Sequence, residues 1–180
     1  TGGNGMVTIG TGTISNTSNT YPAPYGNWYW GARHQFLITA AELSAAGLVA
    51  GPITSLAFDV SNVNGAPSHQ NFQISMGATS LTSLTSMQSG LTQVMTPVNH
   101  QPILGWNTHT FTTPFMWDGI SNVIVETCFN NSSYVYNASV RQSSTSFSSC
   151  AYFRQDAPGV CGNNSLTGTY MQRPNMRLVG

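Results

Sequence analysis

The side chains that could carry acid–base or metal chemistry are few and widely spaced in this sequence. The histidines and carboxylates are His34, His69, His100, His109, Glu42, Asp59, Asp118, Glu126 and Asp156. No HExxH or GxSxG motif occurs, and no Cys/His spacing typical of a zinc site. His109 and Glu126 would form an acid–base or metal pair if their strands were neighbours. The alternative is a histidine hydrogen-bonded on a strand face. The sequence therefore predicts that the chain is not an enzyme.

Calcium is the cofactor that the remaining carboxylates would suit, because Ca²⁺ prefers carboxylate and backbone oxygen ligands. The candidate ligands are Asp59, beside the polar stretch that holds Asn62 and Asn64, together with Asp118 and Asp156. The alternative is that these side chains cap turns, as Asp and Asn commonly do. The expectation is thus either no cofactor or a structural calcium ion.

A loop rich in aromatic residues is the strongest candidate for ligand binding. Residues 21–30 read YPAPYGNWYW, and the candidate binding residues are Tyr21, Tyr25, Asn27 and Trp28. Aromatic rings stack on the C–H faces of sugars, and nearby amides satisfy the hydroxyls, so such a site needs few charges. The alternative is that the rings fill one end of the core. Tyr29 and Trp30 are expected in the core, and Tyr25 and Trp28 at the surface.

The charge balance argues against two classes of partner. Only 6% of the 180 residues are charged, lysine is absent and the net charge is zero. Binding to nucleic acid or to an anionic membrane surface requires excess positive charge, so neither is expected. No apolar run is long enough to cross a bilayer. A surface covered by Ser, Thr, Asn and Gln is typical of an extracellular β protein, or of one that packs against its own copies.

The three cysteines allow one disulfide. A bridge between Cys150 and Cys161 would close a short loop and leave Cys128 as a buried free thiol. Three reduced thiols are the alternative, because sequence does not determine connectivity.

The secondary-structure elements that would position all of these candidate residues are mostly short strands. The strands are expected at residues 6–14, 34–38, 53–60, 71–77, 91–96, 106–113, 122–129, 134–142, 150–154 and 169–180. One helix is expected near residues 40–46, because Thr39 and Glu42 form a capping box and Gly47 can end the helix. Residues 105–129 are expected to form the central hairpin, with a corner at Pro114 and Asp118–Gly119. Residues 53–60 are expected to pair with 71–77.

This pattern predicts an all-β fold: a two-sheet antiparallel β-sandwich of jelly-roll type. It is expected to be a single domain over residues 1–180, with an extended N-terminal arm at residues 1–5.

The order of several motifs resembles a known module. These motifs are TIGTGT, YPAPYGNWYWGARHQFLITAAELSAAG, ITSLAFDV, NFQISMGAT, GWNTHTFTTPFMWDGISNVIVETCFNN and RPNMRLV. Together they are similar to the jelly-roll modules of Bacteroidetes cell-surface and adhesin-like proteins exported by the type IX secretion system. The resemblance implies an extracellular or cell-surface location, often with several modules in one polypeptide. It implies adhesion or glycan binding and carries over no particular functional residue.

Two functions follow as hypotheses. The first is a non-catalytic extracellular binding or adhesion module that binds a glycan or another surface ligand. The second is a structural subunit that assembles with copies of itself into a filament or surface layer, since edge strands can accept a further strand.

Overall fold

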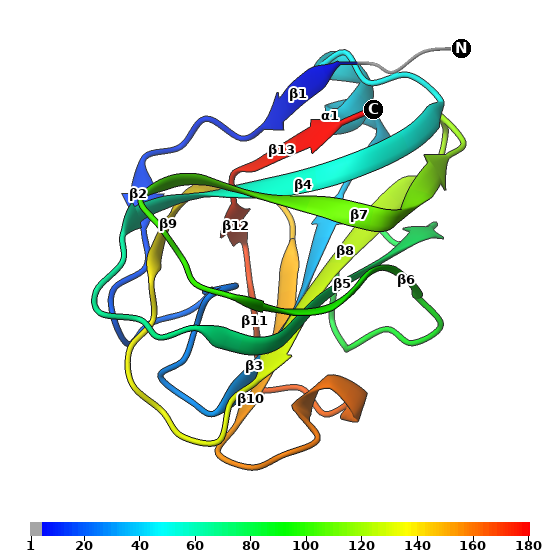
Figure 1. Cartoon of the computed structure of the whole chain (residues 1–180). Coiled ribbons are helices and arrows are strands. Elements are labelled where there is room, and N and C mark those ends of the chain that lie inside the picture. The colour runs from blue at the N-terminus through cyan, green and yellow to red at the C-terminus, as the bar shows by residue number, and fades with distance from the viewer. Residues whose placement is uncertain (1–4) are drawn as a thin grey trace.

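Two antiparallel sheets form a β-sandwich in the computed structural model, which describes residues 5–180 (Figure 1). In this part of the chain, the first sheet contains, in spatial order, β1 (Met6–Ile9), β13 (Met176–Val179), β4 (Gly51–Asn62), β9 (Ser139–Ser144) and β12 (Gln172–Pro174). Two further strands pair onto it: β2 (Ile14–Ser15) with β9, and β7 (Gly105–Trp117) with β4. The predicted all-β sandwich is confirmed. The first four residues of the expected N-terminal arm lie outside the described residues.

The second sheet contains six strands within residues 5–180. Their order is β11 (Gly168–Tyr170), β10 (Cys150–Gln155), β3 (Gly31–Ile38), β8 (Asn122–Asn130), β5 (His69–Thr79) and β6 (Thr92–His100). Alternate side chains of β8 point to opposite faces of this sheet. Val123, Val125 and Phe129 lie in the main core between the sheets, whereas Ile124 packs in a smaller apolar cluster on the outer face. That outer cluster includes Leu84, from the segment between β5 and β6.

The short helix was predicted correctly. Helix α1 spans Ala40–Ala45, and both hydrogen bonds of the Thr39–Glu42 capping box are present. Gly47 follows with φ +103°, a backbone conformation that favours glycine. Glu42 also forms an ion pair with Arg173, which ties the helix to β12.

The central stretch was predicted as a hairpin, and this was wrong. Both strands exist, but β7 belongs to the first sheet and β8 to the second, so the corner at residues 118–121 crosses between the layers. The Trp117 indole donates to the Ser121 carbonyl across that corner at 2.8 Å. His109 therefore lies opposite Leu56 on β4, and Glu126 lies opposite Gln35 and Ser75, so the two do not pair.

The pairing of residues 53–60 with 71–77 was wrong for the same reason. β4 lies in the first sheet and β5 in the second, although both turn a similar apolar pattern toward the core. A period of two identifies the buried face of each strand and leaves its partner undetermined.

The disulfide links Cys128 to Cys161, which corrects the predicted Cys150–Cys161 bridge. Cys128 lies on the outer face of β8, where the 3₁₀ helix η1 (Val160–Gly162) covers it, with 5.7 Å between the two Cα atoms. Cys150 belongs to the main core, between the sheets, and is a free thiol. Burial raises the pKa of that thiol well above its usual range.

Among residues 5–180, no helix has the length and apolar character needed to span a membrane.

Candidate functional site

Three aromatic side chains from two loops gather where β3 begins and β8 ends. Trp28 comes from the loop before β3, and Tyr134 and Tyr136 from the loop after β8. The Trp28 and Tyr136 rings stack with centroids 5.9 Å apart and planes 12° apart, and Tyr134 meets Trp28 edge-on at 5.7 Å. Tyr134 is 57% exposed and Tyr136 46% exposed, while Trp28 is half-buried. We call these three residues the aromatic shelf.

A shallow depression of about 260 Å³ adjoins the shelf. Its lining residues are Trp28, Tyr29, Tyr134 and Asp156. Asp156 follows β10, and its Oδ1 accepts a hydrogen bond from the Trp30 backbone N–H at 3.1 Å. That bond leaves the second carboxylate oxygen available to a ligand. The depression thus combines ring faces with one oriented anionic group.

Two buried asparagines hold the shelf loops together. Asn137 accepts a hydrogen bond from the Trp28 N–H at 2.8 Å and donates one to the Thr20 carbonyl at 2.8 Å. Asn27 donates to the carbonyls of Tyr29 and Ser133, at 3.1 Å each. Both asparagines are fully buried. Their side-chain amides therefore take the place of a regular backbone hydrogen-bond ladder between the two loops. They fix the position of the shelf before any ligand binds.

The backbone of the two loops also meets directly. Gly26 forms an isolated bridge with Asn137, and the Val135 N–H donates to the Asn27 carbonyl at 2.9 Å. A Cβ at Gly26 would lie 2.6 Å from the Ala23 carbonyl oxygen, so only glycine fits there. In Figure 1 these loops are the blue segment before β3 and the yellow segment after β8.

Replacing Asn137 with alanine is expected to lower the free energy of unfolding by about 1–3 kcal/mol, because the Trp28 N–H loses its buried acceptor. Urea denaturation followed by tryptophan fluorescence measures this. Asn19→Ala is the matched control, since Asn19 is exposed and only accepts from the Thr17 hydroxyl. Equal urea midpoints for the two variants would contradict the role assigned to Asn137.

Of the four predicted binding residues, only Trp28 has ring surface at the molecular surface. Tyr25 was expected to be exposed, but it is fully buried and its hydroxyl lies 2.6 Å from His109 Nε2. Tyr21 is buried too, stacks on Tyr152 and donates to the Gly26 carbonyl. Asn27 uses its amide within the loops, as described above. The buried side chains of these three residues are not available to a ligand, and the binding role of Trp28 stays a prediction.

Tyr29 and Trp30 were expected in the core, and both are half-buried instead. The ring of Tyr29 is covered on one side by the Arg154 guanidinium, 4.4 Å from the ring centroid. The Tyr29 ring also packs against the edge of the main core, so the expectation was met in part.

The sequence did not identify Tyr134 and Tyr136 as candidate binding residues, because apolar and polar residues alternate over residues 134–142 as they do in a strand. The strand β9 begins only at Ser139, and the preceding residues are loop. The polar run Asn130–Ser133 was the available signal, since a loop that starts there can extend through the two tyrosines.

Three histidines, two of them buried and one half-buried, surround Tyr25. Its ring centroid lies 5.8 Å from His69 (β5), 5.2 Å from His100 (β6) and 5.9 Å from His109 (β7). Burial lowers the pKa of His69 to about 4 and that of His109 to about 3, and it also lowers the pKa of His100. These rings are therefore neutral near pH 7; His69 and His109 are buried in the core, and His100 is half-buried at its edge.

The three proposed calcium ligands lie in different places. Asp59 pairs with Arg141, and Asp118 caps its own turn, where hydrogen bonds from the Ser121 hydroxyl and two backbone N–H groups lower its pKa. Asp156 lines the depression at the shelf. Across residues 5–180, no group of three or more His, Cys, Asp or Glu side chains could hold a metal ion. The three aspartates therefore do not share a site. A structural calcium ion stays a prediction.

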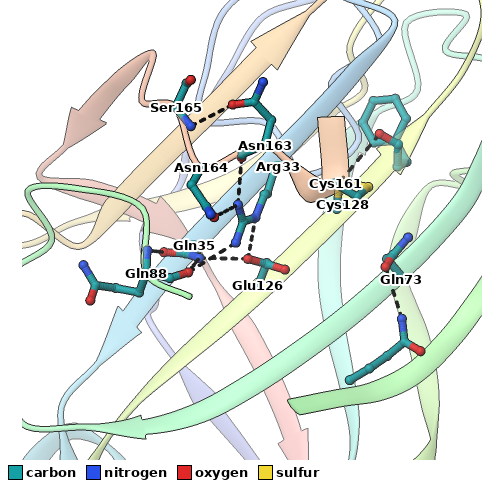
Figure 2. A network of polar contacts seen from close by, with 12 residues as sticks. Arg33, Gln35, Gln73, Gln88, Glu126, Cys128, Cys161, Asn163, Asn164 and Ser165 are labelled. Atoms are coloured by element: carbon teal, nitrogen blue, oxygen red, sulfur yellow. Dashed lines mark hydrogen bonds and ion pairs between the residues drawn. A yellow bond between two sulfur atoms is a disulfide. The ribbon is translucent and has the colours of Figure 1, made fainter. Parts of the chain in front are cut away.

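A second polar cluster lies on the outer face of the second sheet, around Arg33 (Figure 2). Its Nε donates to Glu126 at 2.7 Å, and its Nη1 donates to the Asn163 carbonyl and to Asn164 at 2.8 Å each. Its Nη2 donates to the Gln88 carbonyl at 3.2 Å. All three guanidinium nitrogens are thus engaged. The cluster fastens the segments that contain Gln88 and Asn163–Asn164 to the sheet.

A larger depression of about 410 Å³ lies near α1. Hydroxyl side chains of residues 143–146 line it, together with Phe147, Glu42 and Arg173. Arg173 donates to Glu42 and to the Leu37 carbonyl, so its charge is already neutralised. This depression offers one ring and no free charge, and the shelf is the stronger candidate.

Comparisons with known proteins show the fold and no family. No protein-family model matches the chain, and no curated protein matches it. The resemblance to Bacteroidetes modules therefore stays a prediction.

Several solved structures are similar. The clostridial cysteine protease Cwp84, in its form after propeptide cleavage, has a TM-score of 0.52 at 5% identity, covering 97% of this chain. The protease and lectin-like domains of Cwp84, a surface layer associated protein of Clostridium difficile, give a TM-score of 0.48 at 6% identity, covering 83% of this chain and 32% of that one. A chitosan-binding module of a Paenibacillus sp. IK-5 chitosanase/glucanase gives 0.36 at 12% identity, covering 73% of this chain and 92% of that one. This chain spans 39% of the length of the first of these chains.

Proposed function

We propose that the chain is a non-catalytic, carbohydrate-binding module that acts outside the cell, with the aromatic shelf as its binding surface. The observation that carries the proposal is the aromatic shelf itself, in which the half-buried ring of Trp28 meets the exposed rings of Tyr134 and Tyr136 on loops held by buried asparagines. Rings at the surface present apolar faces to a sugar, and a fixed surface loses little entropy on binding.

The absence of paired carboxylates at the shelf supports a binding role. Glycoside hydrolysis ordinarily uses two carboxyl groups on either side of the bond that is cleaved. The depression contains Asp156 as its one carboxylate among its lining residues. An arrangement of rings with a single acid can orient a sugar, and it lacks the second carboxyl group that glycoside hydrolysis ordinarily uses.

The disulfide supports the proposed extracellular location, because such bonds persist mainly in oxidising compartments. The similarity to the clostridial cysteine protease Cwp84 supports the fold. One fold carries many functions, so the proposal rests on the shelf.

A glycan array probed with the purified chain tests the proposal. We expect the wild-type chain to bind a subset of oligosaccharides and Trp28→Ala to lose that binding. Trp106→Ala is the matched control, since Trp106 is also a half-buried tryptophan but lies on β7 and packs against Arg177. No binding across a broad array would overturn the proposal. Size-exclusion chromatography of the same sample would then show whether the alternative, a self-assembling subunit, forms polymers.

A further inference from the structure

We infer that the sugar bound at the aromatic shelf carries a free, protonated amine, as in deacetylated glucosamine oligomers. This inference rests on the proposed function and specifies the ligand class of the same site.

The five carboxylate side chains of the chain differ in the partners that they have. Three of the five form ion pairs: Glu42 with Arg173, Asp59 with Arg141, and Glu126 with Arg33. Asp118 is occupied by its own turn, through bonds to both of its oxygens. Asp156 has only the Trp30 N–H on Oδ1. Within residues 5–180, Asp156 is thus the one carboxylate with neither a cation nor a side-chain donor, and it faces the depression.

The surroundings of Asp156 also favour a cationic group. Trp28, Tyr29 and Tyr134 line the same depression, and the faces of such rings attract cations. An ammonium group placed there would contact the carboxylate while its sugar ring packs on the shelf. A charge-assisted hydrogen bond of this kind is about twice as strong as a neutral one.

Arg154 is the neighbouring cation that could oppose this arrangement. Its guanidinium lies over the rings of Tyr29 and Tyr21, at 4.4 and 4.8 Å from their centroids. It forms no ion pair with Asp156 in the described chain, and the ring of Tyr29 lies in contact with it. Its charge reduces the attraction for an ammonium group, so we expect a preference of about 10-fold, which corresponds to a single moderate interaction.

Isothermal titration calorimetry with three oligosaccharides tests the inference: a glucosamine hexamer, its fully N-acetylated form, and a glucose hexamer. At about pH 6 we expect the wild-type chain to bind the glucosamine hexamer about 10-fold more tightly than the acetylated one. Near pH 8, where the sugar amine loses its proton, this preference is expected to disappear. Asp156→Asn keeps the acceptor for the Trp30 N–H and removes the charge, so it is expected to lose the preference at about pH 6. Asp118→Asn, an exposed aspartate at the distant corner, is expected to keep it.

Each result separates the inference from the proposed function. Equal or weaker binding of the glucosamine hexamer, or a preference that survives in Asp156→Asn, would overturn the inference. Binding of the other two sugars that still depends on Trp28 would leave the proposed function standing. If the wild-type chain binds none of the three sugars nor any array glycan, both fail. Circular dichroism confirms that each variant is folded.

Discussion

Replacing Glu126 with alanine is expected to lower the free energy of unfolding by about 3–5 kcal/mol, because it leaves the buried Arg33 guanidinium without its counterion. The two side chains are only 6% and 11% exposed, and their contact is 2.7 Å. Gln35 would lose an acceptor at the same time, since its amide also donates to Glu126. Urea denaturation followed by circular dichroism measures the change.

Asp59→Ala is the matched control for this prediction. Asp59 pairs with Arg141 at 3.3 Å, but the arginine side chain is 45% exposed, so the loss is expected to be about 1 kcal/mol or less. The double variant Arg33→Met/Glu126→Leu should recover much of the stability, because it removes both buried charges. Similar losses for Glu126→Ala and Asp59→Ala would show that the buried pair is not a structural anchor.

Acidification is expected to unfold the protein between about pH 6 and pH 4. Burial, together with the charge of Arg154, lowers the pKa of His34 to about 3, and burial brings His109 to about 3 and His69 to about 4. The unfolded chain binds protons at these histidines near pH 6.5, so it holds more protons than the folded chain below that pH. Stability therefore falls as the pH drops, by more than about 1 kcal/mol per pH unit for each histidine.

The melting temperature measured between about pH 7.5 and pH 4 tests this prediction. A steep fall below about pH 6.5 is expected, and full stability near pH 4.5 would contradict it. Since His69 and His109 contact Tyr25, which lies next to the Gly26–Asn27 turn, the shelf loop is expected to loosen as they become charged. The fluorescence of Trp28 should therefore change over the same pH range, and Trp28→Ala provides the background to subtract.

The sequence allowed the class of the fold to be predicted, because that class depends on local patterns. Thr39 and Glu42 lie three residues apart, and their reciprocal bonds are determined within one turn. The pairing of strands depends on which layer each strand joins, and the alternation in β4 and β5 is the same in either layer. The disulfide was predicted wrongly for the same reason. Cys128 and Cys150 lie on opposite faces of the second sheet, and the sequence does not show that η1 covers the outer face, where Cys128 lies.

The site could be predicted in part. The loop of residues 21–30 contains Trp28, which lies half-buried at the surface beside the Gly26–Asn27 turn. Tyr25 lies on the other side of that turn and is buried, because a tyrosine hydroxyl can be satisfied in a core by a histidine. Tyr134 and Tyr136 come from a loop more than 100 residues away, and the Gly26–Asn137 bridge and the hydrogen bonds of Asn27 and Asn137 bring the two loops together. A contact between such distant segments leaves no local signal in the sequence.

The most direct test of the account is a calorimetric titration of the wild-type chain, Trp28→Ala and Trp106→Ala with the tightest-binding glycan from the array. We expect equal dissociation constants for the wild type and Trp106→Ala, and at least a 10-fold weaker one for Trp28→Ala, since stacking on one aromatic ring contributes about 1–3 kcal/mol by analogy with bases. Undiminished binding by a folded Trp28→Ala variant would contradict the assignment of the aromatic shelf as the binding surface.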